Sequence, residues 1–183
     1  MRWFLKPIRI RLPHEVLLRA QTFADQVLET VDYADSNQHQ RQKIRQDHYV
    51  SKLGEEAVFR VFQAFDAAIT APDYTIYAGR QKSWAPDLQV NGLPLAVKTQ
   101  TLEAAERYGL SWTFQCAPSR RDPILDDATA WVCFVEANPQ AHLCRVFPPF
   151  QIHELPFAEP RLPHLIGKKR VVYADALTLK DDL

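Results

Sequence analysis

The sequence predicts a single mixed α/β domain in which helices come first and strands follow. Apolar residues recur at helical spacing up to about residue 65, whereas from residue 74 onward short apolar runs alternate with turn residues. The chain has 183 residues, of which 46% are hydrophobic, which is enough for one domain with a buried core. We expect a helical part at 1–70, a sheet core at 71–147, and a proline-rich loop with a last strand at 148–183.

Two helices are expected in the first part. Residues 13–31 carry apolar side chains at helical spacing, among them Val16, Ala20 and Val27. A second helix is predicted to begin in the polar stretch 35–50, with Asp35 or Ser36 as its cap, and to continue to residue 65. Gly54 makes a break possible, and the segment 71–73 (Ala-Pro-Asp) should end the helical region.

Seven strands are predicted after the helices. They are expected at residues 74–78, 87–90, 93–100, 111–115, 130–136, 142–147 and 170–173. The segment 137–140 indicates a hairpin between the fifth and sixth of these strands. Five prolines within 148–163 predict an ordered loop along the surface.

Composition excludes several classes of protein. The longest apolar run is far shorter than a membrane span, and the basic N-terminus lacks the apolar core of a signal peptide. The three cysteines show no C-x-x-C spacing and the six histidines no zinc pattern, so we expect a cytoplasmic protein with free thiols and no zinc site. Net charge is zero, so any contact with nucleic acid must come from a local basic patch.

The most informative segment is SWAPDLQVNGLPLAVKTQ, residues 83–100. Asn91-Gly92 lies between two short apolar runs and predicts a type I′ hairpin turn, because both central positions of that turn need positive φ. The turn sets Val90 opposite Leu93, Leu88 opposite Leu95 and Asp87 opposite Ala96. Strand alternation then puts Ala96, Lys98 and Gln100 on the face of Asp87.

This arrangement resembles the PD-(D/E)XK nuclease superfamily. Pro86-Asp87 matches the PD element, and Ala96-Val97-Lys98 matches the (D/E)XK element except that alanine stands in place of the acid. The resemblance covers about residues 50–136. It implies a restriction-endonuclease-like central mixed sheet flanked by helices, and Mg²⁺, or Mn²⁺ in its place, as cofactor.

The resemblance also implies roles for individual residues. Asp87 would bind the metal together with the Val97 carbonyl, and Lys98 would orient or deprotonate the attacking water. Glu55 would supply a further acid from a helix packed on the sheet, with Glu56 as the alternative; the spacing of Glu55, Val58 and Phe62 points Glu55 toward the buried side. Gln100 would contact water or the DNA backbone.

Ala96 has three explanations. The chain carries an inactivating acid-to-alanine change, which the otherwise intact motif favours; or the protein is an inactive nuclease fold; or the acid has moved, with Glu103 and Glu106 nearby in sequence.

Basic and polar residues around the motif are candidates for contact with DNA phosphates. They are Arg41, Lys43, Arg45, Lys52, Arg80, Lys82, Ser83, Arg120 and Arg121. We therefore expect a Mg²⁺-dependent endonuclease of the restriction type, which acts as a homodimer on double-stranded DNA and leaves 5′-phosphate ends. The alternatives are a repair nuclease or junction resolvase, and a non-catalytic DNA-binding or assembly module.

Overall fold

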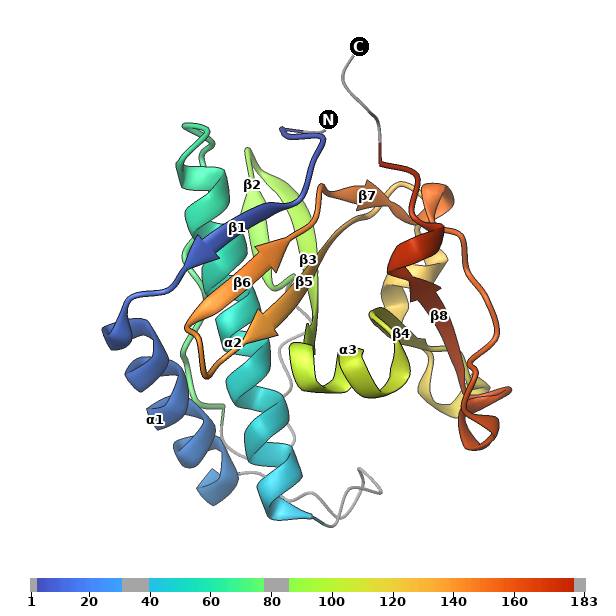
Figure 1. Cartoon of the computed structure of the whole chain (residues 1–183), viewed down its shortest axis with the longest axis horizontal. Coiled ribbons are helices and arrows are strands. Elements are labelled where there is room, and N and C mark those ends of the chain that lie inside the picture. The colour runs from blue at the N-terminus through green and yellow to red at the C-terminus, as the bar shows by residue number, and fades with distance from the viewer. Residues whose placement is uncertain (1–2, 31–39, 78–85, 180–183) are drawn as a thin grey trace.

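A curled mixed sheet organises the fold and confirms the expected mixed α/β class (Figure 1). The computed structural model describes residues 3–30, 40–77 and 86–179. Within them the main sheet has the strand order β1-β6-β5-β3-β2, and β7 pairs with β5. Its strands are β1 (Ile8–Arg11), β2 (Leu88–Val90), β3 (Leu93–Thr101), β5 (Trp131–Asn138), β6 (Leu143–Val146) and β7 (Phe150–Gln151). In the described part of this sheet β3 and β5 pair in parallel, and the other pairs are antiparallel.

Two long helices cover one face of this sheet. They are α1 (His14–Thr30) and α2 (Arg41–Gln63), which pack on each other, and α2 also contacts β3, β5 and β6 (Figure 1). The stripe Leu53, Ala57, Val58, Val61 and Phe62 of α2 is buried in the first core with Leu95, Val97 and Val135 of the sheet. The helix continues through Gly54, so the break that the sequence allowed does not occur. Glycine at this position lets α2 approach β3 closely, as described below. Its N-cap is Gln40; the expected caps Asp35 and Ser36 lie outside the described residues.

A second core fills the opposite face of the sheet. It contains Val132 and Phe134 of β5, while Cys133 and Val135 of the same strand belong to the first core. Both faces of β5 are therefore buried, which explains its continuous apolar run. The second core is closed by a two-stranded sheet of β4 (Ser111–Gln115) and β8 (Lys169–Tyr173), which contributes Trp112, Phe114 and Val172.

Most predicted strands are found within a residue or two of their expected bounds, but the strand expected at 74–78 is wrong. Residues 71–77 form no strand, and Ala78 lies outside the described residues. The pairing next to the hairpin comes instead from Ile69, which forms an isolated bridge with Val90. The predictions also missed β1, β7 and the short helix α3 (Leu102–Tyr108). None of the described helices combines the length and apolarity needed to cross a membrane.

Gly54 is where α2 approaches β3 most closely. A Cβ atom at this position would lie 1.8 Å from Thr99 Oγ1 and 3.0 Å from Thr99 Cβ. We expect Gly54→Ala to lower the free energy of unfolding by about 1–3 kcal/mol, because helix and strand must move apart. Urea unfolding checks this, with Thr99→Ala as the partner change. The double variant should recover part of the loss, and a purely additive loss would contradict the contact.

Candidate functional site

The hairpin forms in the predicted register. Leu88 pairs with Leu95 and Val90 with Leu93, and the turn residues Asn91 and Gly92 have φ angles of 49° and 78°. The Asn91 side chain also accepts a hydrogen bond from the Ala68 backbone at 3.0 Å, which fixes the turn against the end of α2. Continuing the register one step beyond β2 places Asp87 opposite Ala96.

Asp87 lies at the end of this ladder. Its Oδ2 accepts a hydrogen bond of 2.7 Å from the Val97 backbone amide. Although the residue as a whole is exposed, burial of the carboxylate raises its pKa. The Val97 amide, Lys98 and Lys52 oppose that rise, whereas the negative charge of Asp122 adds to it. Asp87 therefore lies in one electrostatic cluster with both lysines and with Asp122.

Glu55 brings a second carboxylate to this cluster from α2. Its side chain is buried, receives a 2.6 Å contact from Lys52 Nζ and accepts a hydrogen bond from Ser51. Burial raises its pKa to about 7, although Lys52 pulls the pKa down, and the charge of Asp87 contributes to the rise. Glu55 of α2 therefore interacts electrostatically with the hairpin acid.

Glu56 has a different environment. It is fully buried, pairs with Arg19 and lies 3.7 Å from Arg60, and the Tyr74 hydroxyl donates to its Oε1 at 3.1 Å. These partners tie α1, α2 and the following loop together. Glu55 therefore interacts with Asp87, whereas Glu56 links α1, α2 and the loop after α2 to one another.

Lys98 is held by an acid that the sequence did not single out. Its Nζ lies 2.5 Å from Asp122 Oδ2 and 4.9 Å from the Phe114 ring centroid. The backbone amide of Asp122 donates to the Gln115 carbonyl at 2.9 Å, which fixes this residue at the end of β4. Glu103 and Glu106, the acids expected as possible substitutes for position 96, are exposed on α3.

No sequence signal distinguished Asp122. It follows two arginines and precedes Pro123, a pattern typical of a surface turn. Its place beside Lys98 depends on how the β4–β8 sheet packs on the main sheet, which no local periodicity encodes.

The acids present suit a magnesium ion that keeps several of its waters. Among the described residues no group of three or more His, Cys, Asp or Glu is close enough to hold a metal. Mg²⁺ is usually bound through one or two carboxylates plus water and substrate oxygens. Glu55 and Asp87 form such a pair, and their raised pKa values show that neighbouring positive charge does not fully offset their burial. A divalent cation would supply the missing charge.

Gln100 shares the face of Lys98 but has structural partners. Its Nε2 donates to the Gly109 carbonyl at 3.3 Å, and its Oε1 accepts from the Ser111 amide at 2.8 Å. These bonds join the end of β3 to the start of β4, so the Gln100 amide holds the second sheet in place.

The predicted DNA-contacting residues fall into three groups. Lys52 belongs to the site, with its Nζ 4.9 Å from the Phe23 ring centroid. Four others already have partners: Arg41 with the Leu28 carbonyl, Lys43 with Asp47, Arg45 with Asp25, and Arg121 with Asp126. Arg80, Lys82, Ser83 and the Arg120 side chain lie outside the described parts of the chain.

Lys169 is a further cation near the site that the sequence reasoning missed. It begins β8, directly opposite Gln115 of β4. Burial lowers its pKa, and the positive charges of Lys43 and Lys98 lower it further. Lys169 therefore interacts electrostatically with lysines on two other elements, Lys43 of α2 and Lys98 of β3, and Asp47 opposes their effect on its pKa.

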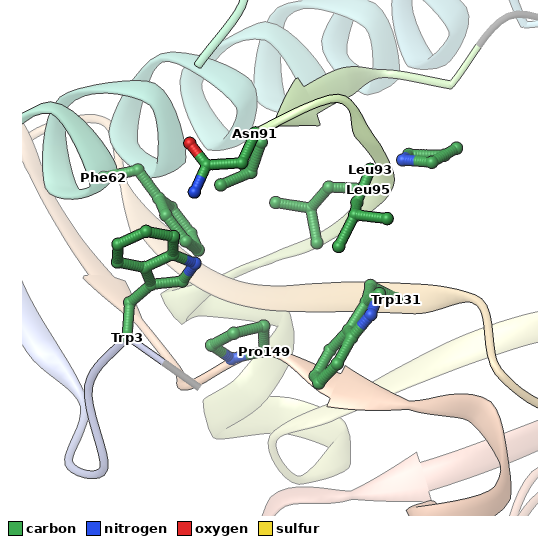
Figure 2. Close-up of a pocket in the computed structure, with 9 residues that line it drawn as sticks. Trp3, Phe62, Asn91, Leu93, Leu95, Trp131 and Pro149 are labelled. Carbon is green, nitrogen blue, oxygen red and sulfur yellow. The ribbon is translucent and has the colours of Figure 1, made fainter. Parts of the chain in front are cut away.

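An apolar pocket of about 250 Å³ lies at the turn end of the hairpin (Figure 2). It is lined by Trp3, Phe62, Leu93, Leu95, Trp131 and Pro149 among others, and no titratable side chain lines it. The pocket has no group that could do acid–base or metal chemistry. Asp87 and Lys98, which lie outside this pocket, are therefore the candidates for chemistry.

Comparison with protein-family models, curated proteins and solved structures found no match to this chain.

Proposed function

We propose that this protein is a Mg²⁺-dependent DNA endonuclease of the restriction type. The observation that carries the proposal is the cluster at the end of the hairpin, where Asp87 interacts electrostatically with Lys98 and with Glu55. Two carboxylates, a lysine and a hairpin that fixes their register match the parts of the PD-(D/E)XK nucleases other than the acid at position 96.

Each side chain of the cluster has a chemical role in this proposal. Asp87 and Glu55 would hold Mg²⁺ together with the Val97 carbonyl. When bound, the ion supplies charge neutralisation at the phosphate and a lower pKa of water. The Lys98 ammonium would orient the attacking water and stabilise the charge on the phosphate oxygens. Water adds to phosphorus, the P–O3′ bond breaks and the 3′ oxygen takes up a proton, which leaves a 5′-phosphate end.

Asp122 supports a revised explanation of Ala96. Asp122, on the segment that follows β4 and 2.5 Å from Lys98 Nζ, would supply a carboxylate beside Lys98 in place of the acid that the family has at position 96. We therefore favour a relocated acid over an inactivating change at position 96. Ala96 itself is half-buried against the second core.

The second candidate is a non-catalytic DNA-binding or assembly module with the same fold. The absence of an acid at position 96 favours it, since Lys98 and Asp122 then form only a structural ion pair. A repair nuclease or junction resolvase would use the same chemistry on another DNA shape.

Double-stranded DNA is the proposed partner, contacted by a homodimer that matches the two-fold symmetry of its target. Lys98 and Lys169 would contribute to the local positive potential that a neutral chain needs. The three cysteines are free, which supports the proposal of a reducing, cytoplasmic location.

Magnesium should stabilise the protein more at high pH than at low pH. The pKa of Glu55 is about 7 in the folded chain against 4.5 in a free carboxyl group. The folded state therefore binds the extra proton between these values, and stability present below pH 4.5 is lost as pH rises through 7. The loss is on the order of 3 kcal/mol, with the same sign for Asp87. Mg²⁺ bound to the ionised Glu55 and Asp87 should restore the stability that is lost at high pH.

Thermal unfolding with and without millimolar Mg²⁺, at about pH 5 and about pH 8, measures this effect. We expect a rise in Tm at the higher pH and little change at the lower. Glu55→Gln should flatten the pH dependence and remove the Mg²⁺ effect. Equal Mg²⁺ shifts at both pH values would rule out Glu55 and Asp87 as the metal site.

A further inference from the structure

A second pocket, of about 330 Å³, adjoins Lys98. It opens between β3, the end of α3 and the β4–β8 sheet. Lys98 contributes to its wall, and the other lining residues used below are Tyr108, Ser111, Thr113, Arg161 and Tyr173. The pocket is thus continuous with the group proposed to act on the phosphate.

Three aromatic residues line this pocket, of which Trp112 is buried in the second core. Tyr108 ends α3 and is 43% exposed, with the Arg107 guanidinium 5.1 Å from its ring centroid. Tyr173 is buried beneath Arg161, whose guanidinium carbon lies 4.2 Å from the ring centroid. The Tyr108 ring is therefore available to a ligand, whereas the Tyr173 ring supports a cation.

Arg161 is positioned by the backbone around it. Its amide donates to the Tyr173 hydroxyl at 2.9 Å, and a Cβ atom on Gly109 would lie 3.3 Å from its Nη1. Gly109 is the C-cap of α3 and has a φ of 82°, so glycine permits the turn there. It also leaves room for the Arg161 guanidinium. No Asp or Glu lines the pocket, and Arg161 pairs with the exposed Asp175 at 3.8 Å.

These groups together suit a nucleotide. An exposed aromatic ring offers stacking, the hydroxyls of Ser111 and Thr113 offer hydrogen bonds to a base edge, and Arg161 and Lys98 offer cations to the phosphates. The volume is at the lower end for ligand pockets, so it admits a single base and excludes a base pair held in a duplex.

We propose that this pocket binds one unpaired base of a DNA strand whose backbone passes Lys98, so that the preferred substrate is duplex DNA with an unpaired nucleotide beside the cut. The inference rests on the proposed nuclease function and names its substrate more closely. An already unpaired base suits the pocket best because no pairing or stacking has to be broken before it enters.

The test compares two short fluorescein-labelled duplexes that differ by one bulged nucleotide. Affinities are measured by fluorescence anisotropy with Ca²⁺ in place of Mg²⁺. We expect the bulged duplex to bind about tenfold more tightly, the range that stacking of one base supplies. Tyr108→Ala should remove this preference and leave binding of the paired duplex unchanged. Tyr108→Phe keeps the ring and should keep the preference.

Tyr77→Ala is the matched control, because Tyr77 is 41% exposed and lies on the loop after α2. A bulged 2-aminopurine gives an independent reading on the unchanged protein: its fluorescence should fall as it stacks. Equal affinity for both duplexes, or equal weakening of both by Tyr108→Ala, would overturn the proposal. Free deoxyadenosine monophosphate that binds as tightly as the bulged duplex would also overturn it, in favour of a nucleotide site.

The proposal for the pocket and the proposal of nuclease function can be contradicted separately. If Tyr108→Ala changes nothing while Lys98→Ala abolishes Mg²⁺-dependent cleavage, the pocket proposal alone is wrong. If the unchanged chain neither binds nor cuts any of these DNAs, both proposals are wrong.

Discussion

Asp122→Asn should reduce Mg²⁺-dependent DNA cleavage by roughly a thousandfold or more, because it removes the acid that holds Lys98. Adding Ala96→Glu to this variant should restore part of the activity, since position 96 lies opposite Asp87 and a glutamate there returns a carboxylate to the cluster. Initial rates on plasmid DNA measure both effects.

Asp126→Asn is the control for this series. Asp126 is four residues further along the chain, and its side chain is 63% exposed and paired with Arg121. Its loss should leave cleavage unchanged. If the unchanged chain is inactive and Ala96→Glu alone makes it cut, the alanine is an inactivating change and Asp122 has no catalytic part. If Ala96→Glu folds, binds DNA and still cuts nothing, the non-catalytic module becomes the better account.

Glu55→Gln and Glu56→Gln should separate activity from stability at adjacent positions of α2. Both glutamates are buried, but Glu55 interacts with Asp87 whereas Glu56 pairs with Arg19, Arg60 and Tyr74. Glu55→Gln should lower cleavage about a hundredfold or more, because one metal-binding carboxylate is lost. Glu56→Gln should lower the free energy of unfolding by about 1–3 kcal/mol, because Arg19, Arg60 and Tyr74 lose a charged acceptor, and should leave the rate per folded molecule intact.

Urea unfolding and cleavage rates on the same preparations check this pair. The opposite pattern, in which Glu56→Gln is stable and inactive, would move the helix acid to Glu56. Equal losses of activity in both variants would show that α2 contributes no specific acid to the site.

The hairpin could be predicted from sequence because its signals are local. Asn91-Gly92 selects the turn, the turn sets the register, and alternation divides Leu88, Leu95 and Val97 from Ala96 and Lys98. Glu55 followed from helical spacing against a buried stripe. In both cases the information lies within a few residues.

The parts of the structure that could not be predicted from the sequence depend on contacts between segments that are far apart along the chain. Asp122 reaches Lys98 only because β4 pairs with β8, 54 residues further along, and packs on the second core. The strand expected at 74–78 is wrong because its β-forming residues serve other contacts: Tyr74 donates to Glu56 and Tyr77 to Asp73. The strand Ile8–Arg11, in which isoleucine alternates with arginine, was missed because it is short and follows a proline, yet it pairs with β6 at the sheet edge.

The central claim is tested most directly by incubating the purified, unchanged chain with supercoiled plasmid and Mg²⁺ beside its Lys98→Ala variant. We predict nicked or linear product from the unchanged chain, with 5′-phosphate ends that DNA ligase can rejoin, none in the presence of EDTA, and none from Lys98→Ala. Cleavage that Lys98→Ala retains at the same rate would contradict the proposed site. No cleavage by the unchanged chain would contradict the claim that it is a working nuclease.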